Sequence, residues 1–317
     1  MRIIAGYQNL DQQDRNASVA IGNFDGVHRG HQVLIDDAKK ASAGGFVGVV
    51  TFEPHPRRFF QPDAPQFRLS TQSDKARLLR DYGVDRLYNL SFDSSLASLS
   101  AEDFVRIVLY QGLGVSHIVV GADFRFGRGR TGDAVMLRTM GAELGFGVTI
   151  HELLGDEAGE FASTAVRAML AEGRCQDAAR QLGRWPSISG PVVMGDQRGR
   201  ELGYPTANLE FGEQMVPRYG IYAAWADVLE GPYQGRHAGV VSIGERPTFG
   251  VNAPNFEVHI FDFSGDLYGT EISVGLVKFL RGEEKFDGID PLIAQMDRDS
   301  MAAREALAAA KIPEWSV

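Results

Sequence analysis

The loop Gly22-Asn23-Phe24-Asp25-Gly26-Val27-His28-Arg29-Gly30-His31 separates a short apolar run, Ser18 to Ile21, from a stretch with helical spacing, His31 to Ala41. Its glycines allow a tight turn and a close approach of the backbone to a phosphate. The N–H groups and dipole at the start of the helix favour an anion there. His28 and His31 are one helical turn apart, so both side chains can face that anion. The loop predicts a phosphate-handling site; the plainer alternative is a glycine loop with two surface histidines.

Outward from this loop, short apolar runs alternate with helical patterns along the first half of the chain. Strands are expected at Ser18 to Ile21, Phe46 to Phe52, Arg86 to Leu90, His117 to Val120 and Gly147 to Ile150. Helices are expected at His31 to Ala41, Ser73 to Tyr82, Ala101 to Gln111, Gly132 to Leu144, Thr164 to Ala171 and Gln176 to Leu182. This alternation predicts an α/β fold with a doubly wound parallel sheet.

The pattern changes near Trp185-Pro186, after which strands and turns dominate. Strands are expected at Ile188 to Met194, Tyr222 to Val228, Ala238 to Ile243, Phe256 to Phe263 and Glu271 to Phe279, and a helix at Pro291 to Ala310. Many short strands followed by one helix predict a small closed β-barrel. We therefore expect two abutting domains, residues 1–185 and 186–317, that fold separately.

Composition argues against several classes of function. A formal net charge of -9 and a pI near 5.3 argue against a nucleic-acid binder with a broad basic surface. The chain has no run of about 18 apolar residues, so no membrane span is expected. The single cysteine, Cys175, rules out an intrachain disulfide framework, and no signal peptide is recognisable, so we expect a protein of the reducing cytoplasm. The oligomeric state stays open.

A second cluster, Gly121 to Asp133, follows the expected strand His117 to Val120. Ligands of open α/β sheets bind at the carboxyl ends of strands. Its three arginines (Arg125, Arg128 and Arg130) suit a phosphate, and its two phenylalanines (Phe124 and Phe126) could flank a planar ring. A solvated Gly/Arg loop is the alternative.

A third cluster is Phe161-Ala162-Ser163-Thr164-Ala165-Val166-Arg167, at the start of an expected helix. Ser163 or Thr164 can cap that helix. Arg167 lies one turn further, so the same helix start could clamp phosphate oxygens with hydroxyl, backbone and guanidinium groups.

Together these strings resemble a known family. The G-x-F-D-x-x-H-x-G-H loop with a later S-T-x-x-R resembles the H-x-G-H nucleotidylyltransferases. The fuller strings, Ile21 to Gln32, Thr51-Phe52-Glu53-Pro54-His55-Pro56 and Gly121 to Asp133, resemble the FMN adenylyltransferase domain of the bacterial bifunctional riboflavin kinase/FAD synthetases.

The resemblance implies roles for individual residues. It assigns catalysis to His28, His31 and Arg167. It assigns nucleotide and flavin binding to Gly22, Phe24, Asp25, Gly30, His55, Asp123, Phe124, Arg125, Ser163 and Thr164. Two positions depart from the family pattern, since Asp123 stands where many relatives carry Asn and Ala162 where they carry Ser. Asp123 adds a negative charge beside a phosphate-handling site.

The string from Gly195 to Asn208, GDQRGRELGYPTAN, resembles the riboflavin kinase signature of the same family. Gly195 and Gly199 allow a loop to lie over ATP phosphates. Thr206 and Asn208 alternate along an extended segment, so both oxygens can face one side and suit a hard Mg²⁺ ion. A plain Pro-Thr-x-Asn turn is the alternative.

Two further segments complete the second resemblance. Family resemblance makes Glu257 the base that takes the proton from the terminal ribityl hydroxyl. Strand alternation places Glu257 and His259 on one face, so His259 stays open as a polar partner, and a solvent-facing strand glutamate is the plain alternative. Asp299 and Arg304 of the terminal helix resemble positions lining the flavin site, although such helix charges are usually only solvated.

The resemblance covers essentially the whole chain and implies one enzyme with two activities. Riboflavin is phosphorylated to FMN, and FMN is adenylylated to FAD, with ATP as co-substrate and Mg²⁺ as cofactor. No nucleic-acid or membrane partner is expected. Two alternatives belong to other classes: another H-x-G-H transferase carrying an unrelated barrel, and a flavin-binding module without catalysis.

Overall fold

The structure is a computed structural model that describes residues 1–152, 155–156, 159–195, 203–245 and 254–312. The chain divides into two compact units. Unit 1 comprises Met1–Ala64 and Gln72–Phe161, and unit 2 comprises Pro65–Thr71 and Ala162–Val317. The predicted boundary between residues 185 and 186 lies within unit 2, and independent folding of the halves on its two sides stays a prediction.

Unit 1 is built on a parallel sheet of six described strands in the order β1-β4-β3-β2-β5-β8. The strands are β1 (Arg2–Ala5), β2 (Ser18–Ile21), β3 (Val47–Glu53), β4 (Arg86–Ser91), β5 (His117–Gly121) and β8 (Gly147–His151). The doubly wound parallel sheet expected from the sequence is confirmed, and β1 is an additional edge strand.

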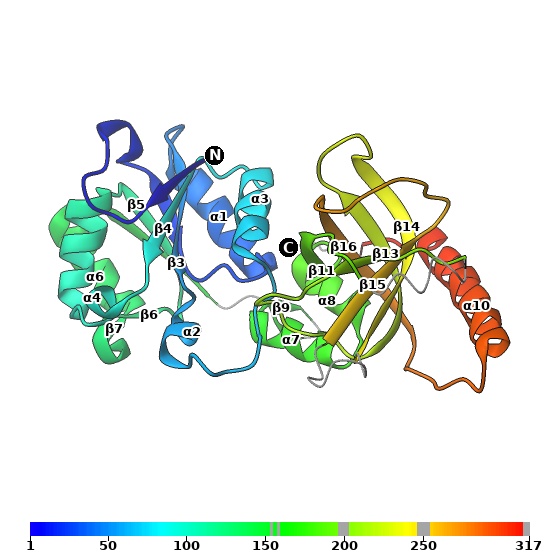
Figure 1. The fold of residues 1–317 in the computed structure, drawn as a ribbon. Coiled ribbons are helices and arrows are strands. Elements are labelled where there is room, and N and C mark those ends of the chain that lie inside the picture. The colour runs from blue at the N-terminus through cyan, green and yellow to red at the C-terminus, as the bar shows by residue number, and fades with distance from the viewer. Residues whose placement is uncertain (153–154, 157–158, 196–202, 246–253, 313–317) are drawn as a thin grey trace. The chain divides into compact units, whose positions relative to one another are not determined.

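Helices cover both faces of this sheet (Figure 1). Buried side chains of α1 (Arg29–Ala41) and α3 (Gln72–Asp81) pack on one face. Those of the π-helical segment η2 (Phe104–Leu113) and of α6 (Ala134–Leu144) pack on the other. The remaining elements of unit 1 are η1 (Gln12–Asp14), α2 (Pro56–Phe60), α4 (Ser94–Ala97), α5 (Ala101–Asp103), β6 (Arg125–Phe126), η3 (Arg128–Arg130), β7 (Gly132–Asp133), β9 (Gly155–Asp156) and β10 (Gly159–Glu160).

The strand order places a topological switch point between β2 and β5. From β2 the chain proceeds to β3 on one side, and later returns to β5 on the other side. Open α/β sheets bind ligands in the crevice outside the carboxyl ends of strands at such a point. The histidine loop follows β2 and the Gly121–Asp133 cluster follows β5, so the topology brings these two loops to the same edge of the sheet.

Unit 2 is an antiparallel barrel of six described strands in the order β11-β16-β13-β14-β15-β12. They are β11 (Ser187–Pro191), β12 (Ala207–Leu209), β13 (Gly220–Val228), β14 (Gly235–Glu245), β15 (Pro254–Ile260) and β16 (Glu271–Arg281). The barrel nearly closes, because Val193 N donates to Asn208 O at 2.8 Å beyond the end of β11. The small barrel and the terminal helix expected from the sequence are confirmed.

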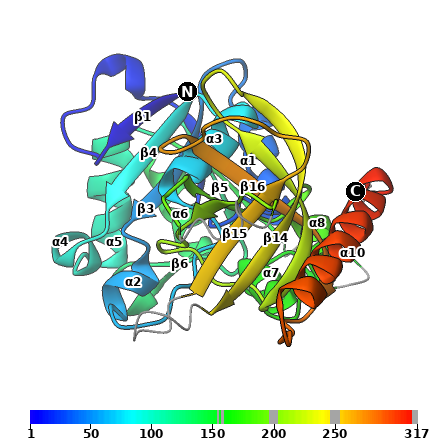
Figure 2. The same ribbon diagram turned by 45° about the vertical axis from the view of Figure 1, so that its right-hand side comes forward.

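Among the described residues of unit 2, three helices accompany the barrel: α7 (Ser163–Ala171), α8 (Cys175–Leu182) and α10 (Ile289–Ala308). Figure 2 shows α10 along the outside of the barrel. The buried side chain of Trp185 packs in one cluster with Ala179 of α8, Val277 of β16 and Ala303 of α10. Residues before the predicted boundary at Trp185-Pro186 therefore belong to the hydrophobic packing of the barrel.

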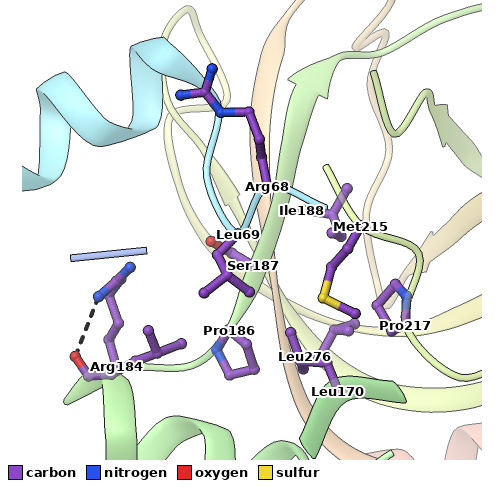
Figure 3. Close-up of a pocket in the computed structure, with 11 residues that line it drawn as sticks. Arg68, Leu69, Leu170, Arg184, Pro186, Ser187, Ile188, Met215, Pro217 and Leu276 are labelled. Carbon is purple, nitrogen blue, oxygen red and sulfur yellow. Dashed lines mark hydrogen bonds between the residues drawn. The ribbon is translucent and has the colours of Figure 1, made fainter. Parts of the chain in front are cut away.

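The early segment Pro65–Thr71, which we call the strap, is hydrogen-bonded to the later part of unit 2. Arg68 N donates to Glu213 O at 3.2 Å, and Met215 N donates to Arg68 O at 2.8 Å. Figure 3 shows residues from the strap, α7 and β11 around a cavity of about 10 Å³. Such a volume holds at most about one water molecule. The cavity is a packing feature and too small for a ligand.

Candidate active sites

The two histidines of the first loop lie face to face at the start of α1. His28 is the N-cap residue of the helix and His31 lies in its first turn. Their ring centroids are 3.6 Å apart and the rings are 25° from parallel. The ring of Phe24 lies 4.7 Å from that of His31. The structure thus brings together the pair that the sequence placed on one side of the helix start.

The histidine loop has an unusual backbone. Phe24 and Val27 have φ angles of 50° and 40°, a region that a β-branched residue such as Val27 seldom adopts. A Cβ at Gly30 would lie 3.1 Å from Phe161 O and 3.2 Å from the His28 ring. The loop is therefore closely packed at Gly30, and its backbone is strained at Phe24 and Val27, whose side chains are fully or nearly fully buried. Strain of this kind often marks functional sites.

The second loop at the switch point, Gly121–Asp133, carries exposed positively charged side chains. Arg125, Arg128 and Arg130 are all exposed, as is Asp123. Phe124 is half-buried and stacks on Phe126 with 5.5 Å between ring centroids. The sequence predicted that Phe124 and Phe126 could both flank a planar ring. Phe126 does not fit this prediction, because it is only 6% exposed and packs in the core against Phe104. Phe124 is the ring of this pair that a planar ligand can reach.

His55 has a structural contact in addition to its expected binding role. It is the N-cap of α2, and its Nδ1 accepts a hydrogen bond from Arg57 N at 3.1 Å. Since Nδ1 accepts, the proton of a neutral ring lies on Nε2. Gly22 and Asp25, the other predicted binding residues of the first loop, lie directly after β2, and Asp25 is buried.

The third cluster lies in unit 2 from Ala162 onward, whereas its first residue, Phe161, is the last residue of unit 1. Ala162, and neither Ser163 nor Thr164, is the N-cap residue of α7, and the side chain of Ala162 makes no capping hydrogen bond. The capping interpretation is therefore wrong: the helix begins at Ser163, one residue too early for its hydroxyl to cap. Arg167 Nε donates to Phe67 O of the strap at 2.6 Å. His28 and His31 lie in unit 1, and Arg167 lies in unit 2.

The predicted kinase residues gather on the outer face of the barrel, on β12 and β15. Asn208 and Glu257 are directly opposed in the strand register. Their sequence neighbours Leu209, Phe256 and Val258 point into the barrel core, so both polar side chains point outward. Directly opposed residues of an antiparallel pair have Cβ atoms about 4.5–5.5 Å apart. Thr206 lies one residue before β12 and is half-buried.

Two neighbours hold these side chains in place. Asn255 Nδ2 donates to Glu257 Oε1 at 2.8 Å. A Cβ at Gly195 would lie 2.5 Å from Asn208 Oδ1, so Gly195 passes directly over this carboxamide, which is only 4% exposed. Sequence reasoning missed Asn255, although it lies two residues from Glu257 on the same strand face. Gly199 lies outside the described residues.

His259 holds the chain just before Thr206. Its Nδ1 is 2.9 Å from Pro205 O, and its ring centroid is 5.0 Å from that of Tyr204. The Tyr204 hydroxyl donates to Asp297 of α10. Burial, helped by this carboxylate, raises the pKa of Tyr204 to about 12. His259 is thus a polar partner of the segment that carries Thr206.

The two charged residues predicted on the terminal helix have firm partners. Asp299 accepts three bonds from Arg281 of β16, at 2.7 to 3.1 Å. Arg304 makes two bonds to Asp262, at 2.8 and 2.9 Å, and lies 4.3 Å from the Phe261 ring centroid. These bonds from Arg304 lower the pKa of Asp262.

Comparisons with known proteins identify the family. A model of FAD synthetase matches residues 10–165, and a model of riboflavin kinase matches residues 182–307. A curated bifunctional riboflavin kinase/FMN adenylyltransferase of Escherichia coli (strain K12) is 40% identical over 310 residues, covering 96% of this chain and 97% of the relative. The chain belongs to the family of bifunctional riboflavin kinase/FMN adenylyltransferases. A relative of the same name from Pseudomonas fluorescens is 39% identical over 98% of each chain.

As a member of this family, the chain is an enzyme with riboflavin kinase and FMN adenylyltransferase activities, both using ATP. The riboflavin kinase match excludes an unrelated barrel. A crystal structure described as a macrolide-efflux protein of Streptococcus pneumoniae has a TM-score of 0.84 and 31% identity, covering 95% of this chain and 98% of that one. Among the residues described here, no helix is both long and apolar enough to cross a bilayer.

Proposed function

We propose that the two activities use two separate sets of residues, one centred on the histidine pair of unit 1 and the other on the Asn208–Glu257 pair of unit 2. The observation that carries this proposal is their segregation, since the stacked histidines lie at the switch point of unit 1 and the Asn208–Glu257 pair lies on the barrel of unit 2. In both reactions the protein has to position two substrates and neutralise developing charge, with no covalent intermediate on the enzyme.

For adenylyl transfer, His28 and His31 donate hydrogen bonds to the phosphoryl group as charge develops on it. An oxygen of the FMN phosphate attacks the α-phosphate of ATP, the new P–O bond forms, and pyrophosphate leaves. The exposed arginines of the second loop support this assignment because they add positive charge at the same sheet edge. A catalytic role for Arg167 and a binding role for Ser163 and Thr164 remain predictions.

For phosphoryl transfer, Glu257 takes the proton of the terminal ribityl hydroxyl as that oxygen attacks the γ-phosphate and ADP leaves. The bond from Asn255 occupies Oε1 and leaves Oε2 as the acceptor for the substrate. The side-chain oxygens of Thr206 and Asn208 are hard ligands suited to Mg²⁺, which is commonly held by one or two protein groups together with substrate phosphates. When bound, this ion neutralises phosphate charge. We expect Arg304 to line the flavin site.

We place the enzyme in the cytoplasm. This assignment rests on the need for ATP in both reactions and on the single cysteine, Cys175, which is a buried free thiol.

Matched variants test whether the two activities use separate sets of residues. The enzyme is mixed with riboflavin, ATP and Mg²⁺, and FMN and FAD are followed separately. His28→Ala is expected to slow FAD formation from FMN by about 10²-fold and to leave FMN formation unchanged. Glu257→Gln is expected to slow FMN formation by about 10²–10⁴-fold and to leave FAD formation from added FMN unchanged.

His259→Gln is the control for Glu257, and it should cost far less than Glu257→Gln. Equal loss of both activities in either site variant would refute separate sites. Retention of more than about a tenth of kinase turnover by Glu257→Gln would remove Glu257 as the base.

A further inference from the structure

A buried ammonium group lies next to the histidine loop. The side chain of Lys75, on α3, is 2% exposed, and its Nζ lies 2.7 Å from Glu53 Oε1 and 3.1 Å from Thr51 Oγ1. Lysine is almost never fully buried unless it is paired. Glu53 and Thr51 lie in the string Thr51 to Pro56, of which the family resemblance gives a binding role only to His55.

Two contacts of this ammonium group lead toward the first loop. Lys75 Nζ donates to Thr51 Oγ1, and Thr51 Oγ1 in turn donates to Asn23 O at 3.1 Å. Nζ itself lies 3.5 Å from the same carbonyl. The Asn23 carbonyl belongs to the peptide bond that leads into Phe24, the first residue of the loop with a positive φ.

The same peptide bond is connected to the histidines by packing. Phe24 is completely buried, and its ring contacts the ring of His31, which stacks on His28. If the Asn23 carbonyl is released, Phe24 can relax from its φ of 50° and the ring against His31 can shift. Shifts of about 1 Å at a catalytic group can cost about 10²-fold in rate.

We propose that Lys75 is a positioning residue for adenylyl transfer. Glu53 holds the ammonium, and the ammonium with Thr51 anchors the Asn23 carbonyl, which fixes Phe24 and thereby the ring of His31. This inference rests on the proposed role of the histidine pair. The competing explanation is that the buried ion pair only stabilises unit 1.

Three variants separate positioning from stability. Lys75→Met removes the ammonium, whereas Glu53→Gln/Lys75→Met removes both charges and leaves none unpaired. Thr51→Val keeps the shape and both charges and removes only the hydroxyl that bonds to Asn23 O. Lys40→Met, which breaks an exposed ion pair with Asp37 on α1, is the matched control. For each variant, kcat and the KM values for FMN and ATP are measured, together with kinase turnover and thermal unfolding.

Positioning predicts that kcat for FAD formation falls by about tenfold in Thr51→Val and by about 10²-fold in the double variant. Both KM values should stay within about threefold, because the histidines act on the transition state. Kinase turnover should not change. Lys40→Met should match the wild type in all of these measurements.

A stabilising role would instead lower the unfolding temperature and leave kcat per folded molecule unchanged. If Thr51→Val and the double variant are folded and keep kcat within about threefold while His28→Ala loses about 10²-fold, the proposal for Lys75 is wrong. If His28→Ala also keeps wild-type turnover, the proposed adenylyl site itself fails. Should Lys75→Met not fold, the other two variants decide.

Discussion

Replacing Gly195 by alanine perturbs the kinase site through one contact. The new Cβ would lie 2.5 Å from Asn208 Oδ1, whereas ordinary contacts begin at 3.4 Å, so the oxygen must move by about 0.9 Å. Asn208 has little free space because it is 4% exposed and β12 pairs with β15 on one side. A displacement near 1 Å at a positioning group costs about 10²-fold. We expect FMN formation in Gly195→Ala to fall by about that factor.

The assay follows FMN formation from riboflavin at saturating ATP, and FAD formation from added FMN in the same preparation. Gly282→Ala is the matched control, since a Cβ there meets no atom within 4 Å and Gly282 does not have a positive φ. FAD formation should be normal in both variants. If Gly195→Ala keeps more than about a third of wild-type kinase turnover, a fixed Asn208 carboxamide is not required for the reaction.

Three other perturbations have defined outcomes. A fragment beginning at Pro186 should phosphorylate riboflavin but unfold at a lower temperature than a fragment beginning at Ala162. The longer fragment keeps α7, α8 and the packing of Trp185. Equal unfolding temperatures would show that this packing contributes nothing to the stability of the barrel. Burial lowers the pKa of His117, so the unfolded chain binds a proton more readily and stability should fall as pH drops below about 6.5. His117→Gln should reduce this slope in denaturant titrations at pH 5.5 and 7.5, and an unchanged slope would contradict the assignment. Arg304→Ala should raise KM for riboflavin more than it lowers kcat, and a pure kcat effect would place Arg304 outside the flavin site.

Much of the fold could be predicted because its elements carry strong local patterns. The central strands β2 and β5 of unit 1 are short, mostly apolar runs. The predicted boundaries of β2, β4 and β5 differ from the structure by at most one residue. The edge strand β1 was missed because its four residues are mostly exposed and show no alternation. β12 was missed because it spans three residues directly after the Pro-Thr pair.

The candidate sites could be predicted less completely. Sequence motifs and the family resemblance predict His28, His31, Asn208 and Glu257 as site residues, because these residues lie in strings with a recognisable order. The contacts that hold them come from residues distant in sequence, such as Lys75 below the histidine loop and Asp297 beside Tyr204. Nothing local in the sequence indicates such tertiary partners.

The strap also bears on how this chain folds during synthesis. Arg68 must pair with Glu213, which is 145 residues later in the sequence. At translation rates of roughly 5–20 residues per second, about 7–30 s pass between the synthesis of these two residues. During that interval Gln72–Phe161, the second segment of unit 1, is synthesised, while the bonds of the strap to residues 213 and 215 cannot yet form. Slowing translation between residues 71 and 213 would lengthen its exposure to proteases and chaperones without altering a single amino acid.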